Sequence, residues 1–432
     1  MPRSLRRLPR VLLASAAAAG VAATAGVAGA ATGSAATGTT STSRPDPAYV
    51  RTTADTRLAS RLTTRATETR FGSAFSGAVM DAGSNTLLWS RNGDTALMPA
   101  STTKLVTASN ALTTYGPAFR FTTTVKQGAA ANRVVLVGSG DPTLTSAAVD
   151  RLASATATAL RGKGITSAQV YADDYLFPAP TLAYGWRSTY VPTDITPVRA
   201  LVRSQHDVAD TTVDAAAYFR DRLKAHGVTA AYAGRTRAAS GATVLASSAG
   251  YRLDTIVGQM LMDSDNEHAE ALHKLVGLRL GTGATWLGAA QAQRARMASR
   301  GLPVTALYDG SGLSRADRLT AVQLARIVDA AFDARNSTAL APLRSASAMP
   351  TAGETGTLAA SYGRFVSASS KCAVGKVWAK TGSLDDAASL AGWTVGTDGR
   401  VKTFAFVVNG RKSTLTLKQD LDMLAATVNG CY

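Results

Sequence analysis

The stretch "PASTTKLVTASNALTTYG", residues 99–116, places Ser101 three positions before Lys104 at the start of a predicted helix that ends at Gly116. Residues at positions i and i+3 share a helix face, which brings the lysine ammonium to the serine hydroxyl. The N-terminus of a helix favours developing negative charge, and a desolvated lysine can act as a base near neutral pH. The pair is therefore a candidate nucleophile and base, although a Ser-x-x-Lys pattern alone is expected roughly once by chance in a chain of this length.

A second candidate site is Ser264-Asp265-Asn266, which opens another predicted helical stretch. Its hydroxyl can relay a proton to a leaving group, and its amide can orient a substrate carbonyl. The same residue types are also favoured helix N-caps, so a purely structural role stays open at this point. A second Ser-x-Asn pattern begins at Ser90, before Ser101, and its position in a predicted hairpin indicates turn chemistry.

A third candidate site is Lys380-Thr381-Gly382, followed by Ser383, at the end of an alternating apolar segment. On an edge strand it would present a cation and a hydroxyl to a substrate carboxylate, and the glycine would leave room for close approach. The alternative is a hairpin turn. With the lysines of this chain, a Lys-Thr-Gly sequence is expected by chance only about a tenth of the time, which favours the functional interpretation.

The order of the three motifs is the signature of active-site serine penicillin-recognising enzymes. The long gap between the first two motifs resembles the low-molecular-mass class C penicillin-binding proteins, which are D-alanyl-D-alanine carboxypeptidases and endopeptidases. Three further segments carry the resemblance: "GSGDPTL" (138–144), "DGSGLSRADRLT" (309–320) and "MPTAGETGTL" (349–358). The resemblance extends from about Pro47 to the C-terminus. A class A β-lactamase is a shorter chain with a Glu-x-x-Leu-Asn sequence, which is not found here.

The resemblance implies an α+β fold of the penicillin-binding transpeptidase/β-lactamase-like type, with an antiparallel sheet flanked by helices and a smaller inserted domain. It also implies catalytic roles. Ser101 would attack the carbonyl between two terminal D-alanines, and Lys104 would take its proton. Ser264, with Lys380 nearby, would pass a proton to the leaving amine, while Asn266 would position the peptide.

Substrate binding is implied for the residues that follow Lys380. Thr381, with Lys380 nearby, would hold the substrate carboxylate, and Gly382 would allow close approach. Ser383 stands where the family often has threonine, and its backbone N–H would form an oxyanion hole with that of Ser101. No metal or cofactor is required for this chemistry.

The implied function is that of a secreted serine DD-peptidase acting on peptidoglycan stem peptides, with β-lactams as covalent inhibitors of Ser101. Two alternatives stay open. One is a serine β-lactamase or esterase on the same fold, and the other is a non-catalytic protein that binds the cell wall.

The N-terminus resembles an export signal, because four arginines precede an uncharged run from Val11 to Ala30 that ends in an Ala-x-Ala sequence. A retained membrane anchor is the alternative, but alanine and glycine insert less favourably than leucine. We therefore expect a secreted or extracytoplasmic protein. The predicted organisation is a signal peptide (1–30), a flexible linker (31–46), a serine DD-peptidase domain (47–118 and 251–432) and an inserted domain (119–250).

Local patterns predict a leading helix from Pro47 to about Thr67 and a β-hairpin over residues 72–94. The inserted segment reads as short strands and helices, and helical periodicity returns from Leu253 through Leu280. "VKTFAFVVNG" predicts a strand and "LTLKQDLDMLAATVNG" an amphipathic helix at the C-terminus.

Composition excludes several other classes. The 432 residues are 46% hydrophobic and 17% charged, which is typical of a globular protein. The net charge is +17, without a dense basic run interleaved with aromatic residues, so we expect no nucleic acid partner but a weak attraction to anionic wall polymers or a membrane surface. Cys372 and Cys431 are too few for a zinc cluster, and whether they form a disulfide stays open. His268 and His273 do not have zinc-peptidase spacing, and Thr143 interrupts a glycine-rich dinucleotide pattern.

Overall fold

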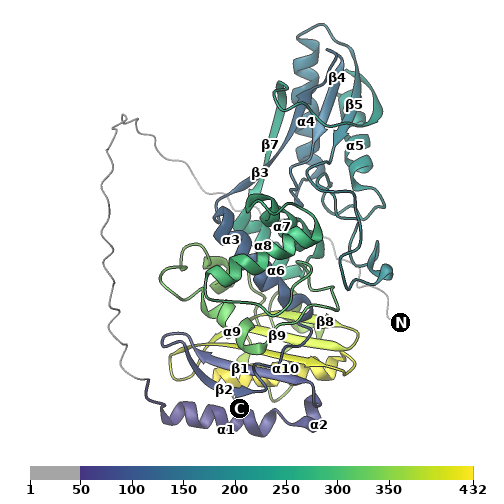
Figure 1. The fold of residues 1–432 in the computed structure, drawn as a ribbon. Coiled ribbons are helices and arrows are strands. Elements are labelled where there is room, and N and C mark those ends of the chain that lie inside the picture. The colour runs from purple at the N-terminus through teal and green to yellow at the C-terminus, as the bar shows by residue number, and fades with distance from the viewer. Residues whose placement is uncertain (1–48, 432) are drawn as a thin grey trace, which may run out of the picture. The chain divides into compact units, whose positions relative to one another are not determined.

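The computed structural model describes residues 49–431, so the predicted signal peptide and linker lie outside the described residues. Its central sheet has five antiparallel strands in the order β2-β1-β10-β9-β8, drawn in purple and yellow in Figure 1. The strands are β1 (Phe75–Asp81), β2 (Thr86–Arg91), β8 (Val377–Leu384), β9 (Ala387–Val395) and β10 (Val401–Asn409). This arrangement confirms the predicted hairpin over 72–94, the C-terminal strand and the antiparallel sheet.

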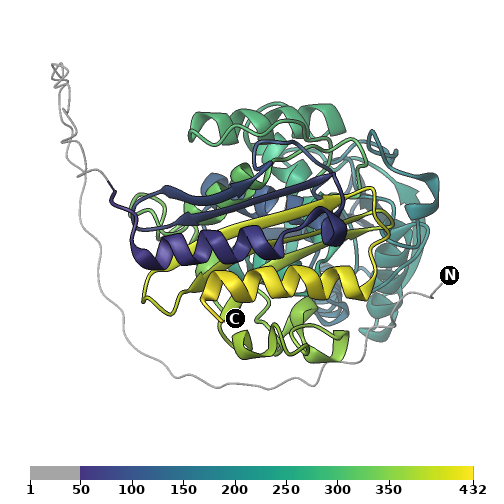
Figure 2. The same ribbon diagram turned by 90° about the horizontal axis from the view of Figure 1, so that it is seen from below.

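Helices cover both faces of this sheet. On one face lie α1 (Thr53–Arg65) and α10 (Leu415–Asn429), which run side by side in Figure 2. On the other face lies α9 (Ala321–Asp329). Successive strand residues point to opposite faces, so Phe404 and Phe406 pack with α10 while Ala405 and Val407 join the core around α9. Burial on both faces explains why β10 is apolar almost throughout.

The segment quoted above forms a short 3₁₀ turn, η1 (Ala100–Thr103), followed by the helix α3 (Lys104–Tyr115). The prediction of a helix ending at Gly116 is confirmed, with the difference that its first turn is 3₁₀. Every residue of α3 from Lys104 to Leu112 is buried, because this helix packs among α6 (Leu253–Asp263), α7 (Asn266–Arg279) and α8 (Trp286–Ser299). A polar side chain on α3 therefore sits away from solvent.

The helical stretch predicted from Leu253 to Leu280 is two helices, α6 and α7, which are separated at Ser264. Ser264 has a left-handed backbone conformation (φ 58°), which ends α6. Asp265 then caps α7 by accepting a hydrogen bond from the N–H of His268 at 3.0 Å.

A second five-stranded sheet, in the order β6-β5-β4-β3-β7, is formed by residues 120–252 and appears at the top of Figure 1. Its strands β4, β5 and β6 are parallel, because α4 and α5 connect them as crossovers. The elements are β3 (Arg120–Gln127), β4 (Arg133–Val137), α4 (Ser146–Arg161), β5 (Ser167–Asp173), α5 (Thr211–Ala225), β6 (Thr229–Arg235) and β7 (Val244–Arg252). The described residues form one compact unit, so the separate domain over 119–250 stays a prediction.

The remaining elements are short. They are the helix α2 (Glu68–Phe71) and the 3₁₀ turns η2 (Ser188–Tyr190), η3 (Ala341–Arg344), η4 (Gly356–Leu358), η5 (Ala360–Tyr362) and η6 (Lys371–Ala373). Cys372 in η6 forms a disulfide with Cys431, directly after α10. This pairing decides the question that the sequence left open. Within residues 49–431, no helix combines the length and apolar character needed to cross a membrane.

Candidate active site

The three sequence motifs meet in the structure, although they come from distant parts of the chain. Lys104 Nζ lies 3.1 Å from Ser101 Oγ and donates a hydrogen bond to Asn266 Oδ1 at 2.8 Å. Lys380 Nζ donates to Ser264 Oγ at 2.8 Å. Asp265 of the second motif therefore caps α7, while Asn266 and Ser264 bind Lys104 and Lys380. The third motif lies within β8, so the hairpin-turn alternative is wrong.

Ser101 is held between two close backbone approaches. A β-carbon on Gly382 would lie 2.7 Å from the carbonyl oxygen of Pro99 and 3.1 Å from the nitrogen of Ser101. A β-carbon on Gly312 would lie 1.9 Å from the carbonyl oxygen of Ala100, which itself has a positive φ of 49°. Only glycine fits at these two approaches, so β8 and the loop around Gly312 fix the position of Ser101.

Lys104 is fully buried, and it has a third hydrogen-bond acceptor in the carbonyl oxygen of Ser311 at 2.8 Å. Burial lowers the pKa of Lys104 to about 8, and the negative charges of Glu270 and Asp309 oppose this shift. A lysine with this pKa is partly neutral near neutral pH, as a general base requires.

Lys380 is also fully buried, and it donates a second hydrogen bond to the carbonyl oxygen of Thr381 at 2.7 Å. Burial holds the pKa of Lys380 well below its usual range, and the positive charges of Lys104 and Arg364 add to this shift. With its lowered pKa and its hydrogen bond to Ser264 Oγ, the Lys380 amine can exchange a proton with the Ser264 hydroxyl.

The other residues of the third motif follow Lys380 on the same strand, β8. Thr381 Oγ1 donates to Thr357 Oγ1 at 2.8 Å, which places the segment "MPTAGETGTL" beside β8. The side chain of Ser383 is exposed and lies 2.8 Å from Ser413 Oγ, so only its backbone N–H is available for the predicted oxyanion role. The substrate-binding roles of Thr381, Gly382 and Ser383 stay predictions.

Several site residues were missed in the sequence. The buried Glu270 accepts hydrogen bonds from the loop that carries Ser311, and its spacing of four residues from Asn266 on one helix face was the available signal. The carbonyl of Asp194 accepts a hydrogen bond from Asn266 Nδ2 at 2.9 Å, and no local pattern indicates this long-range contact. The segment 309–320, which carries part of the resemblance, reaches the site through Ser311, whose carbonyl accepts a hydrogen bond from Lys104.

The remaining sequence candidates do not contact Ser101, Lys104 or Lys380, although His268 Nδ1 lies 2.9 Å from Asp265 Oδ1 of the second motif. Ser90 Oγ accepts the N–H of Gly93 at 3.2 Å, which confirms its turn role. Thr143 donates through both its N–H and its hydroxyl to Asp141 in a local turn. His268 and His273 are buried on α7. Among residues 49–431, no three histidine, cysteine, aspartate or glutamate side chains are grouped so that they could hold a metal ion.

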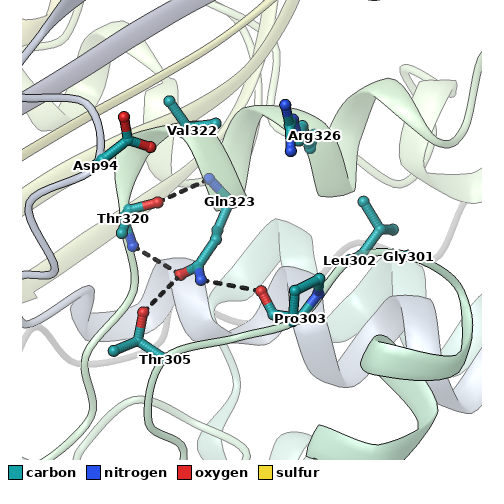
Figure 3. Close-up of a pocket in the computed structure, with 9 residues that line it drawn as sticks. All are labelled: Asp94, Gly301, Leu302, Pro303, Thr305, Thr320, Val322, Gln323 and Arg326. Carbon is teal, nitrogen blue, oxygen red and sulfur yellow. Dashed lines mark hydrogen bonds between the residues drawn. The ribbon is translucent and has the colours of Figure 1, made fainter.

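A cavity of about 330 Å³ lies at the start of α9, away from the three motifs (Figure 3). Gln323 on its wall accepts hydrogen bonds from the N–H of Thr320 and the hydroxyl of Thr305, and it donates to the carbonyl of Pro303. These polar groups satisfy one another, so the cavity offers no comparable catalytic arrangement.

Comparison with known proteins agrees with this geometry. The model of the D-Ala-D-Ala carboxypeptidase 3 (S13) family matches residues 58–205 and 190–428. A carboxypeptidase of Mycobacterium tuberculosis is 34% identical over 358 residues, which cover 77% of this chain and 76% of that protein.

Solved structures share the fold at low identity. Penicillin-binding protein 4 of Haemophilus influenzae superposes with a TM-score of 0.68 at 18% identity, covering 84% of this chain and 98% of that one. A second structure of that protein, in complex with a β-lactam, has a TM-score of 0.63 at 20% identity and the same coverage. The α+β penicillin-binding fold predicted from the motifs is therefore confirmed. With the family match over most of its length, the chain belongs to the D-Ala-D-Ala carboxypeptidase 3 (S13) family and is a serine-type DD-peptidase.

Proposed function

We propose that Ser101 is the nucleophile of this DD-peptidase and that Lys104 is its general base. The observation that carries the proposal is the set of contacts around Lys104 Nζ. A neutral lysine amine has two N–H groups and one lone pair, and Asn266 Oδ1 and the Ser311 carbonyl provide acceptors for both N–H groups. The lone pair is then directed at Ser101 Oγ, 3.1 Å away.

In the acylation step, Ser101 Oγ bonds to the carbonyl carbon between the two terminal D-alanines, and its proton moves to Lys104. The negative oxygen that forms is stabilised by the backbone N–H groups of Ser101 and Ser383, a contribution of about 3 kcal/mol for each donor. Collapse of this intermediate breaks the peptide bond. Ser264, hydrogen-bonded to Lys380, donates the proton that the leaving amine needs, and Lys380 restores the serine proton.

Asn266 and Thr381 position the substrate in this proposal. The Asn266 amide is anchored between Lys104 and the Asp194 carbonyl, so it is held beside the reacting groups. Thr381, with Lys380 behind it, holds the terminal carboxylate of the peptidoglycan stem peptide.

The proton on Lys104 then replaces the one that left Lys380, so Lys104 is neutral again when water hydrolyses the acyl-enzyme. Lys104 takes the proton of that water and returns it to Ser101 Oγ as the product acid leaves. The leaving amine can be free D-alanine or the amine of a cross-link, and parallel assays on a pentapeptide and a cross-linked dimer distinguish these activities.

Acylation by a β-lactam tests this assignment. We expect the protein to form one covalent adduct with a labelled penicillin, because the strained amide presents a carbonyl to the same serine. Peptide mapping should locate the label on Ser101. Intact-protein mass spectrometry measures the adduct. An unlabelled wild-type protein, or equal labelling of the Ser101→Ala variant, would contradict the proposal.

The pH dependence follows from the Lys104 pKa of about 8. Because the neutral amine is the active form, kcat/KM for D-alanine release should rise with pH and level off as the pH passes this value. Measuring kcat/KM from pH 5.5 to 9.5 gives this rising limb of the pH profile, which reports the ionisation of the free enzyme. A rate that is constant over pH 6 to 9 would argue against Lys104 as the base.

We also propose that the protein works outside the cytoplasm after cleavage of its N-terminal segment. The leader-like sequence motivates this proposal, and the Cys372–Cys431 disulfide supports it because structural disulfides persist in oxidising compartments. N-terminal sequencing of protein recovered from the culture medium is expected to begin near Ala31. Recovery only as a full-length membrane-bound chain would contradict cleavage.

A further inference from the structure

Glu270 lies directly behind the loop that supplies an acceptor to Lys104. It follows Asn266 by four residues on α7, so the two side chains share one helix face. The Glu270 side chain is fully buried, and each of its carboxylate oxygens accepts a backbone hydrogen bond. Gly310 N–H donates to one oxygen at 2.9 Å and Ser311 N–H to the other at 2.7 Å.

These contacts determine how the loop presents the Ser311 carbonyl. Thr107 on α3 donates to the Gly310 carbonyl at 2.7 Å, and a β-carbon on Gly310 would lie 2.6 Å from the Ala269 carbonyl oxygen. The loop is therefore pressed against α7 and fixed on both sides of Gly310. With its N–H bound to Glu270, Ser311 places its carbonyl oxygen 2.8 Å from Lys104 Nζ.

We propose that Glu270 is a positioning residue for the DD-peptidase reaction: its two carboxyl oxygens hold the Ser311 carbonyl against Lys104, and in its ionised form it adds a negative charge beside the base. The inference rests on the proposed role of Lys104 and adds a residue that touches neither the substrate nor the nucleophile. Two functions are combined in one side chain. The hydrogen bonds orient the amine, and the ionised carboxylate favours the charged amine, so it raises the pH at which the amine becomes neutral.

The charges around the pair agree with this assignment. Glu270 is the strongest of the acidic groups that oppose the fall in the Lys104 pKa, ahead of Asp309, Asp265 and Glu267, and Lys380 on β8 adds positive charge. Glu270 itself faces Asp309, Asp317, Lys274 and Lys104. Burial and the nearby Asp309 raise the pKa of Glu270 to about 8, and the two N–H donors oppose this rise. Glu270 therefore ionises over the same pH range in which Lys104 loses its proton.

Two substitutions separate the hydrogen-bonding function from the charge. Glu270→Gln keeps the shape but removes the charge and replaces one acceptor with an N–H₂ group. For this variant, the rising limb of kcat/KM for D-alanine release should move to lower pH by about one unit, the lower end of the effect of a nearby opposite charge. Its maximal kcat should fall about tenfold. Glu270→Asp keeps the charge but reaches the loop less well, so kcat should fall while the limb stays within about 0.3 pH units of the wild type.

Asp329→Asn is the matched control, because Asp329 is a buried carboxylate on α9 and is not among the acidic groups that act most strongly on the pKa of Lys104. Burial raises the pKa of Asp329 to about 7, so asparagine resembles its protonated form. For this variant, we expect the rising limb of kcat/KM with pH and the maximal kcat to match those of the wild type. Circular dichroism and thermal unfolding establish which variants are folded.

The outcomes distinguish this inference from the role of Lys104. A folded Glu270→Gln variant with the wild-type limb would leave Glu270 a packing residue and overturn the proposal. If Glu270→Gln does not fold, Glu270→Asp decides, because a wild-type kcat in that variant would show that the loop contacts are dispensable. Activity retained in Lys104→Met would instead overturn the proposed base, whatever Glu270 does.

Discussion

Replacing Ser101 with alanine is expected to abolish D-alanine release, lowering kcat/KM about 10⁴-fold or more, because no acyl-enzyme can form. The change removes one oxygen atom from the half-buried Ser101 in η1 and leaves the buried Lys104 contacts with Asn266 and Ser311 in place. The variant should therefore fold and still bind substrate. Release of D-alanine from a pentapeptide, together with equilibrium binding of that peptide, measures the two properties separately.

Ser90→Ala is the control for this experiment, because the Ser90 hydroxyl lies at the end of β2 and accepts a hydrogen bond from the N–H of Gly93, away from the three motifs. It should retain wild-type activity. Residual D-alanine release by Ser101→Ala at more than about a hundredth of the wild-type rate would assign the nucleophile to another group.

Replacing Lys104 with methionine is expected to lower kcat/KM about 10³-fold, within the range that a positioned general base contributes. Methionine has similar length but cannot accept the Ser101 proton. It also leaves Asn266 Oδ1 and the Ser311 carbonyl without their donor, and an unsatisfied buried acceptor costs about 1–3 kcal/mol. Thermal unfolding should be measured beside the activity, since the loss of a buried charge offsets part of this cost.

Lys163→Met is the matched control, because Lys163 is exposed after α4 and makes one long contact, 3.4 Å, with Gln127. Its activity should equal that of the wild type. The acylation rate with labelled penicillin gives a second readout for Lys104→Met, and it should fall in parallel with D-alanine release. A folded Lys104→Met variant with unchanged acylation would show that another group takes the Ser101 proton.

Local sequence patterns predicted the elements that depend on local chemistry. The β1–β2 hairpin, α1, β10 and α10 all carry their own periodicity and turn signals, and the structure contains each of them. The break at Ser264 coincides with the predicted helix start at Ser264-Asp265-Asn266, but the positive φ with which Ser264 ends α6 was not predicted. The parallel pairing of β4, β5 and β6 depends on contacts between strands that are far apart in sequence.

The sequence by itself indicated the family of this protein, because three motifs stand in the order that is typical of it, and the same motifs predict the nucleophile, the base and the groups around them. The tertiary structure decided what makes these groups work. Lys104 has a pKa of about 8 only because α3 is buried among other helices, and its amine is oriented only because Asn266 and Ser311 reach it from other segments. The contact of Glu270 with the Ser311 loop and the Cys372–Cys431 disulfide likewise join segments that are far apart in the sequence. Desolvation and long-range hydrogen bonds depend on which segments pack together, and that information is absent from any local pattern.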